Sequence, residues 1–171
     1  MSLRGKSCRL AVLVSAAALV PTFSTGQDAH PEPAAIFVGG AAALDVSRAV
    51  RDAVDRLQEP GCQRLLDDFT DREGRPLREN LGTSTPDVYL ARLVLREGEI
   101  PRGSGHCASR GAAAFTVDGA AVFVCGTSFR TLARGARANA LIHEMLHTLG
   151  LRENPPSSAE ITRRVAGRCG G

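Results

Sequence analysis

The segment from His143 to Gly150 constrains this chain more than any other, because it combines two histidines with a helical apolar pattern. His143 and His147 lie four residues apart, and on a helix such residues occupy one face, one turn above the other. Two imidazole nitrogens can therefore point at one position, as in a zinc site. Glu144 is rotated away from that face, so we expect its carboxylate to act on a water at the ion as general base.

The residues around this motif predict a long, largely buried helix at residues 132–149. Apolar residues recur at helical spacing, at Leu132, Ala136, Ala140, Leu141, Met145, Leu146 and Leu149. Histidines on a buried helix need partners, because an unpaired polar group is costly to bury. We therefore interpret His143 and His147 as zinc ligands rather than as histidines that meet by chance on a solvated helix.

With Gly150 three residues after its second histidine, the motif resembles that of the zincin metallopeptidases, and among them the metzincins. In metzincins, H-E-x-x-H-x-x-G-x-x-H, the glycine turns the chain so that the last residue, His or Asp, becomes the third zinc ligand. The matching residue here is Glu153, and a carboxylate is an acceptable zinc ligand. The resemblance thus implies Zn²⁺ held by His143, His147 and Glu153.

The chain also departs from the metzincin pattern. Its third ligand is a glutamate, and no methionine follows Met145, so the Met-turn is missing from the sequence. Gluzincins take their third ligand from a glutamate on the next helix, which makes Glu160 the alternative to Glu153. Ser157 and Glu160 have the S-x-x-E spacing of a helix capping box, which explains Glu160 without a metal. We therefore prefer Glu153, and the resemblance is confined to residues 137–153.

The first residues are typical of a secretory signal peptide. Basic residues precede an apolar run at residues 10–20, which Pro21 ends and which is too short to span a membrane. We predict a signal peptide at residues 1–26, a flexible polar leader at residues 27–40 and a single zincin-like domain at residues 41–171. No membrane span would remain after cleavage.

Cysteine usage agrees with a secreted or periplasmic protein. Cleavage would remove Cys8 and leave an even number of cysteines in an oxidising compartment, namely Cys62, Cys107, Cys125 and Cys169. Because the sequence has no C-x-x-C pair, we predict two disulfides rather than a cysteine-bound zinc. Three connectivities are open. Proximity along the chain favours Cys107–Cys125, which leaves Cys62 to pair with Cys169.

Hydrophobic periodicity predicts helices before and after the motif. We expect helices at residues 44–57, 62–69 and 85–92, a polar loop at residues 71–82, and a capped last helix that ends near Cys169.

The strands are expected just before the motif helix. Residues 93–96 read as one strand, and residues 112–117 and 120–125 read as a hairpin around the turn signal Asp118-Gly119. The resemblance implies that this hairpin packs on the motif helix and that its edge strand lines the substrate cleft. We interpret His106, in a Gly/Ser-rich segment without spacing to the motif, as an ordinary loop histidine.

These observations predict an α+β domain and a zinc-dependent hydrolase, most simply a metallopeptidase acting on a peptide or protein substrate. The alternative is a secreted zinc-binding protein with a structural or vestigial metal. Four protein ligands would close the site, whereas three leave the open position that catalysis needs, and the candidates beyond the two histidines are Glu153, Glu160 and His106. The net charge of +3 is small, basic residues are scattered and aromatic residues make up only 4% of the chain. Nucleic-acid binding, which depends on basic clusters and aromatic stacking, is therefore not expected.

Overall fold

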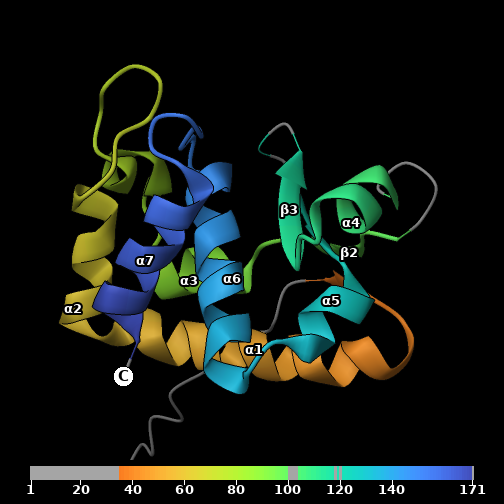
Figure 1. Ribbon diagram of the computed structural model, residues 1–171. Helices are drawn as coiled ribbons and strands as arrows, with labels where there is room; N and C mark the ends of the chain where they lie inside the picture. The colour runs from red at the N-terminus through yellow and green to blue at the C-terminus, as the bar shows by residue number, and fades with distance from the viewer. Residues whose placement is uncertain (1–34, 100–103, 118, 120, 171) are drawn as a thin grey trace, which may run out of the picture.

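The computed structural model describes residues 35–99, 104–117, 119 and 121–170, and these form one α+β domain (Figure 1). The elements in chain order, with η marking 3-10 helices, are β1 (Ile36–Phe37), α1 (Gly40–Gln58), α2 (Pro60–Gln63), η1 (Arg64–Asp67), η2 (Leu77–Leu81), α3 (Pro86–Ala91), β2 (Leu95–Glu97), α4 (Ser104–Arg110), β3 (Ala114–Val117), β4 (Ala121–Val124), α5 (Gly126–Thr131), α6 (Arg134–Thr148) and α7 (Ser158–Cys169). The predicted signal peptide lies outside the described residues.

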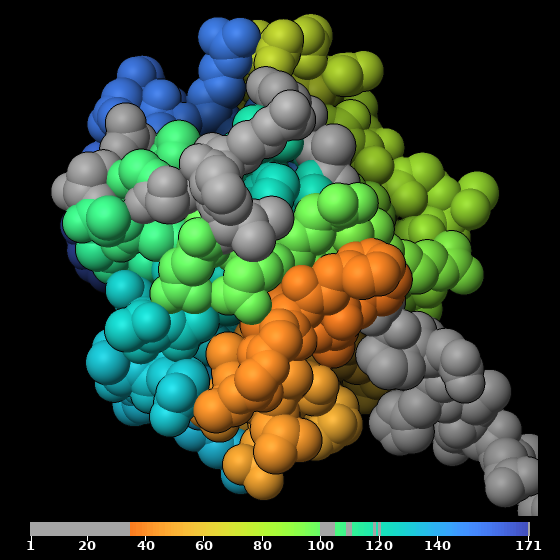
Figure 2. Space-filling model, turned by 90° about the vertical axis from the view of Figure 1, so that its right-hand side faces the viewer, coloured from red at the N-terminus to blue at the C-terminus, as the bar shows by residue number. Residues whose placement is uncertain are grey.

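The four strands form one mixed sheet in the order β1-β2-β4-β3. β1, β2 and β4 run parallel, whereas β3 and β4 form the predicted antiparallel hairpin, with Phe115 opposite Phe123. The space-filling view shows the start of α1, in orange, beside the green segment that contains β2 (Figure 2). Because the strand order ends in β3, this strand forms one edge of the sheet, and it lies on the side of α6.

Two predictions about the first half of the chain need correction. β1 lies inside residues 27–40, which we predicted to be a flexible leader, and it is ordered because Ile36 pairs with Leu95 of β2. The predicted polar loop at residues 71–82 contains the helical turn η2, which forms because Leu77 and Leu81 are buried in the core. The predicted helix at 62–69 is divided between α2 and η1.

The core lies where α1 and α6 pack together and where α6 meets the sheet. α1 presents an apolar face, including Val46, Val50 and Leu57, to α3 and α6. Met145 and Leu146 of α6 are fully buried, as the sequence pattern predicted for the motif helix. In Figure 1, α6 stands between α7 on one side and β3 on the other. The motif helix is therefore held from both sides.

Both predicted disulfides are present. Cys62–Cys169 joins α2 to the end of α7, and Cys107–Cys125 joins α4 to the end of β4. Among the described residues, no helix has the length and apolar character needed to cross a membrane.

Candidate metal centre

The two motif histidines lie one helical turn apart on α6 and face the same point. Their Nε2 atoms are 3.0 Å apart, and their ring centroids are separated by 4.9 Å. His143 is buried, and the His147 side chain is 15% exposed. The i,i+4 spacing read from the sequence thus brings the two nitrogens together at the surface of a buried helix.

Glu153 reaches the histidines because the chain reverses immediately after α6. Gly150 has a φ of +100°, a conformation that glycine adopts without strain, and a Cβ there would lie 3.3 Å from the Cβ of Asp71. Two backbone hydrogen bonds hold the turn, from Gly150 N to His147 O and from Leu151 N to Leu146 O. Glu153 Oε1 then lies 3.6 Å from His147 Nε2 and 3.9 Å from His143 Nε2.

The separations of these three atoms suit a metal ion. For distances of 3.0, 3.6 and 3.9 Å, the point equidistant from the three atoms lies about 2 Å from each of them. Zinc binds imidazole nitrogen and carboxylate oxygen at about this distance. His143, His147 and Glu153 are the one group of three or more metal-binding side chains with this proximity among the described residues.

Each histidine has a partner on its other ring nitrogen. His147 Nδ1 is 2.9 Å from the carbonyl oxygen of Leu151, and because a carbonyl can only accept, Nδ1 must carry the proton. The lone pair of the neutral ring is then on Nε2, which faces Glu153. His143 Nδ1 is 3.0 Å from Thr162 Oγ1 on α7. Such outer partners orient metal-binding imidazoles and fix their tautomer.

The protonation of His143 also suits metal binding. Burial, with a smaller contribution from the neighbouring His147, lowers the pKa of His143 from 6.5 to about 4. The imidazole is therefore neutral at neutral pH, which is the form that coordinates a metal.

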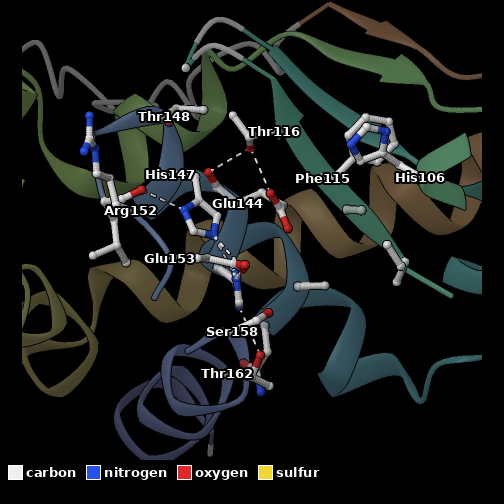
Figure 3. A pocket seen from close by; sticks show the side chains of 18 of the residues that line it. His106, Phe115, Thr116, Glu144, His147, Thr148, Arg152, Glu153, Ser158 and Thr162 are labelled. Carbon is white, nitrogen blue, oxygen red and sulfur yellow. Dashed lines mark hydrogen bonds and ion pairs between the residues drawn. The ribbon is translucent and has the colours of Figure 1, made fainter. Parts of the chain in front are cut away.

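Glu144 lies beside the three ligand candidates but is not one of them. Glu144 is buried, and Thr116 Oγ1 of β3 donates a 2.8 Å hydrogen bond to Glu144 Oε2 (Figure 3). Burial raises the pKa of Glu144, while His147 and the hydrogen bond from Thr116 act in the opposite direction. A buried carboxylate of raised pKa beside a metal site is suited to accept and return a proton.

The rival ligand Glu160 is engaged elsewhere. Its backbone N–H donates to Ser157 Oγ, so Ser157 caps α7 as the sequence predicted. Its carboxylate accepts a hydrogen bond from Arg164, one turn along the same helix. Among the two glutamates considered from sequence, only Glu153 stands with the histidines.

His106 differs in part from its prediction. It lies in α4 rather than in a loop, and its exposed ring stacks on Phe115 at a centroid distance of 4.7 Å. It does not belong to the metal-binding group. The disulfide between the adjacent Cys107 and Cys125 places α4 beside the hairpin, so the pairing favoured from the sequence already contained the signal for this position.

The candidate metal centre opens into a cleft of about 1080 Å³. β3 and the preceding residues 112–113 form one wall, and α6, α7 and the turn after Gly150 form the other. Figure 3 shows Thr116 beside Glu144, and the Glu153 carboxylate next to the ring of His147. Thr116 and Thr162 were not anticipated from the sequence, because nothing in their local pattern ties them to the motif.

Comparison of the chain with family models, with curated proteins and with solved structures gave no match. The function of the site is therefore argued from its own geometry.

Proposed function

We propose that the chain is a zinc-dependent metallopeptidase of the zincin type. The observation that carries the proposal is the set of three ligand atoms, on His143, His147 and Glu153, with a common point about 2 Å from each. A Zn²⁺ ion held there would act as a Lewis acid on a carbonyl oxygen and would lower the pKa of a bound water.

The side chains supply the proton transfers. Glu144 takes a proton from the attacking water and returns it to the leaving amine, so the carboxylate is regenerated in each turnover. The hydrogen bond from Thr116 fixes the orientation of this carboxylate. Leu151 O and the Thr162 hydroxyl hold the imidazole rings of His147 and His143 in place, so the ligand atoms need little rearrangement.

An extended peptide suits the cleft. β3 is an edge strand of the sheet that the described residues form, and its residues from Ala114 to Thr116 line the cleft wall. A substrate segment can pair with the free edge of such a strand through backbone hydrogen bonds, which favours a peptide over a compact small molecule.

The number of ligands favours catalysis over a structural metal. Closed structural zinc sites have four protein ligands, whereas catalytic sites have three and leave one position for water or substrate. Within the described part of the chain, three side chains meet at the site, and Glu160 and His106 are not among them.

We also propose that the protein is secreted or exported to a periplasm. The two disulfides are typical of an oxidising compartment, and the first 26 residues have the pattern of a signal peptide.

The experiment compares three purified proteins on a mixed peptide library, with bound zinc measured in each and cleaved bonds identified by mass spectrometry. We expect the wild type to bind one zinc and to cleave peptides. Glu144→Gln should retain zinc and lose cleavage, because it removes the proton acceptor without changing shape. His143→Ala/His147→Ala should lose both. A fully zinc-loaded wild type that cleaves nothing would refute the peptidase and favour a binding protein.

A further inference from the structure

Two arginines at one end of the cleft take no part in the chemistry proposed above. Arg72 and Arg152 are both exposed, both line the cleft, and neither has a hydrogen-bond or ion-pair partner among the described residues. Neighbouring arginines differ, because Arg75, Arg78 and Arg164 are each paired with a carboxylate. The guanidinium groups of Arg72 and Arg152, here called the basic pair, are thus free to bind a ligand.

The backbone that carries the basic pair is firmly anchored. Arg72 follows Asp71, whose carboxylate accepts hydrogen bonds from the backbone N–H groups of Glu73 and Arg75. Asn80 then donates both to Asp71 Oδ2, at 3.0 Å, and to the carbonyl oxygen of Leu149 at the end of α6, at 2.8 Å.

The turn that bears Arg72 is therefore fixed against the turn that bears Arg152. Gly150 lies against Asp71, and Arg152 follows it by two residues. Arg72 and Arg152 also both line a second, smaller hollow that adjoins the cleft. Two segments far apart in the sequence thus present two cations at one place.

The charge of the cleft supports a role in binding. The carboxylates that line it are those of Glu144 and Glu153, and both belong to the proposed catalytic centre. A bound divalent ion would offset these two negative charges. The adjoining hollow also carries Asp68, Asp71 and Glu160, but each of these carboxylates is paired with another arginine. The basic pair then remains as positive charge without a partner carboxylate, and low salt would extend its attraction to about 10 Å or more.

The two ends of the cleft differ in chemistry. Figure 3 places Arg152 on the opposite side of His147 from Phe115 and His106. At the end of the cleft near the start of α6, the lining residues other than Asn139 are small or apolar, and they include Ala112, Ala113, Leu132, Ala136 and Ala140. A negatively charged group would therefore meet opposite charge only at the end that carries the basic pair.

We propose that the cleft selects peptides with an aspartate or glutamate a few residues from the scissile bond, on the side that faces Arg72 and Arg152. The inference rests on the proposed peptidase function. Guanidinium groups bind carboxylates through paired hydrogen bonds, so an acidic side chain would gain contacts that an amide of the same shape lacks.

The first test is the residue preference of cleavage in the mixed peptide library. Asp and Glu should be enriched on one side of the cleaved bond, and Arg72→Ala and Arg152→Ala should each reduce that enrichment about two- to fivefold. Added salt should reduce it as well. Arg163→Ala on α7, an exposed arginine that does not line the cleft, is the matched control and should leave the preference unchanged. The charge reversal Arg72→Glu/Arg152→Glu should shift the preference to Lys and Arg.

The second test measures binding without turnover. Fluorescein-labelled peptides that differ only by three Asp or three Asn residues are titrated into zinc-loaded Glu144→Gln protein, and anisotropy is followed. The Asp peptide should bind more tightly, and the difference should disappear when Arg72 and Arg152 are replaced by alanine.

The outcomes separate the two proposals. Cleavage without acidic enrichment overturns the selectivity and leaves the peptidase standing. Tighter binding of the Asp peptide without cleavage supports an acidic-ligand site and removes the peptidase. If the protein shows no cleavage and no preference for the Asp peptide, both proposals are refuted.

Discussion

Replacing Thr162 by valine should weaken zinc binding while leaving the fold intact. The change removes one hydroxyl and keeps the shape and β-branching of the side chain. That hydroxyl oxygen lies 3.0 Å from His143 Nδ1, on the side of the ring away from the proposed ion. Without it, a nitrogen on a side chain that is only 8% exposed loses its described partner, and the ring loses the contact that orients it.

The expected loss follows from comparable supporting contacts in zinc proteins. Removal of such an outer partner lowers metal affinity by about 10- to 100-fold. This corresponds to about 1.4 to 2.8 kcal/mol of binding free energy. Thr162 itself is exposed, but the change leaves the buried His143 Nδ1 without its described partner, so the metal-free protein should also lose about 1 to 3 kcal/mol of unfolding free energy.

Competition with a chromogenic chelator at neutral pH measures the zinc affinity, and urea unfolding of the metal-free proteins measures stability. Ser158→Ala is the matched control, because this residue lines the same cleft from the first turn of α7 and makes no described hydrogen bond to either histidine. If Thr162→Val binds zinc as tightly as the wild type, or if Ser158→Ala loses as much affinity, then Thr162 does not support the site.

Three further changes test other parts of the structure. Glu153→Gln should reduce zinc affinity by more than the roughly 10- to 100-fold expected for a supporting contact, whereas Glu160→Gln should leave it unchanged in the same chelator assay; equal losses would contradict the ligand assignment. Hydrogen bonds from Asn80 and Arg75 hold the pKa of Asp71 well below its ordinary value of 3.8, so its contribution to stability is present above about pH 4 and is lost as the pH falls. Asp71→Asn should therefore reduce the fall in unfolding free energy between pH 7 and pH 2.5, measured by urea unfolding. An unchanged dependence of the unfolding free energy on pH would argue against this anchor. Replacing both cysteines of Cys62–Cys169, which lie 107 residues apart, should destabilise the protein by about 4.7 kcal/mol, compared with about 3 kcal/mol for the 18-residue disulfide; the opposite order in denaturant unfolding would contradict the chain-entropy argument.

The parts of the site that sequence could predict are those set by local geometry. The spacing of His143 and His147 on one helix determines their proximity wherever that helix lies. The turn at Gly150 returns the chain within a few residues, so Glu153 follows from the same short segment. The capping of α7 by Ser157 is likewise a local relation, because its hydroxyl accepts from the backbone N–H of Glu160, three residues away.

The parts that sequence could not predict depend on packing between distant segments. Thr116 and Thr162 contact the motif only because β3 and α7 lie against α6. β1 is two residues long and is ordered by pairing with β2, and no local sequence pattern predicts this contact. The same holds for Arg72, which reaches the cleft through an anchor that joins Asp71 to Leu149.

The ligand residues lie close together in the sequence, whereas the residues that orient them lie far away. This difference affects the order in which the site is assembled. The ligand atoms come from one short stretch, residues 143–153, but their orientation depends on α7, whose last residue is covalently tied to Cys62. An unfolded chain therefore already carries the ligand residues but not the oriented site. Under the proposed function, zinc would reach its full affinity only after α7 has docked against α6, so loading of the metal would come late in the folding of the protein.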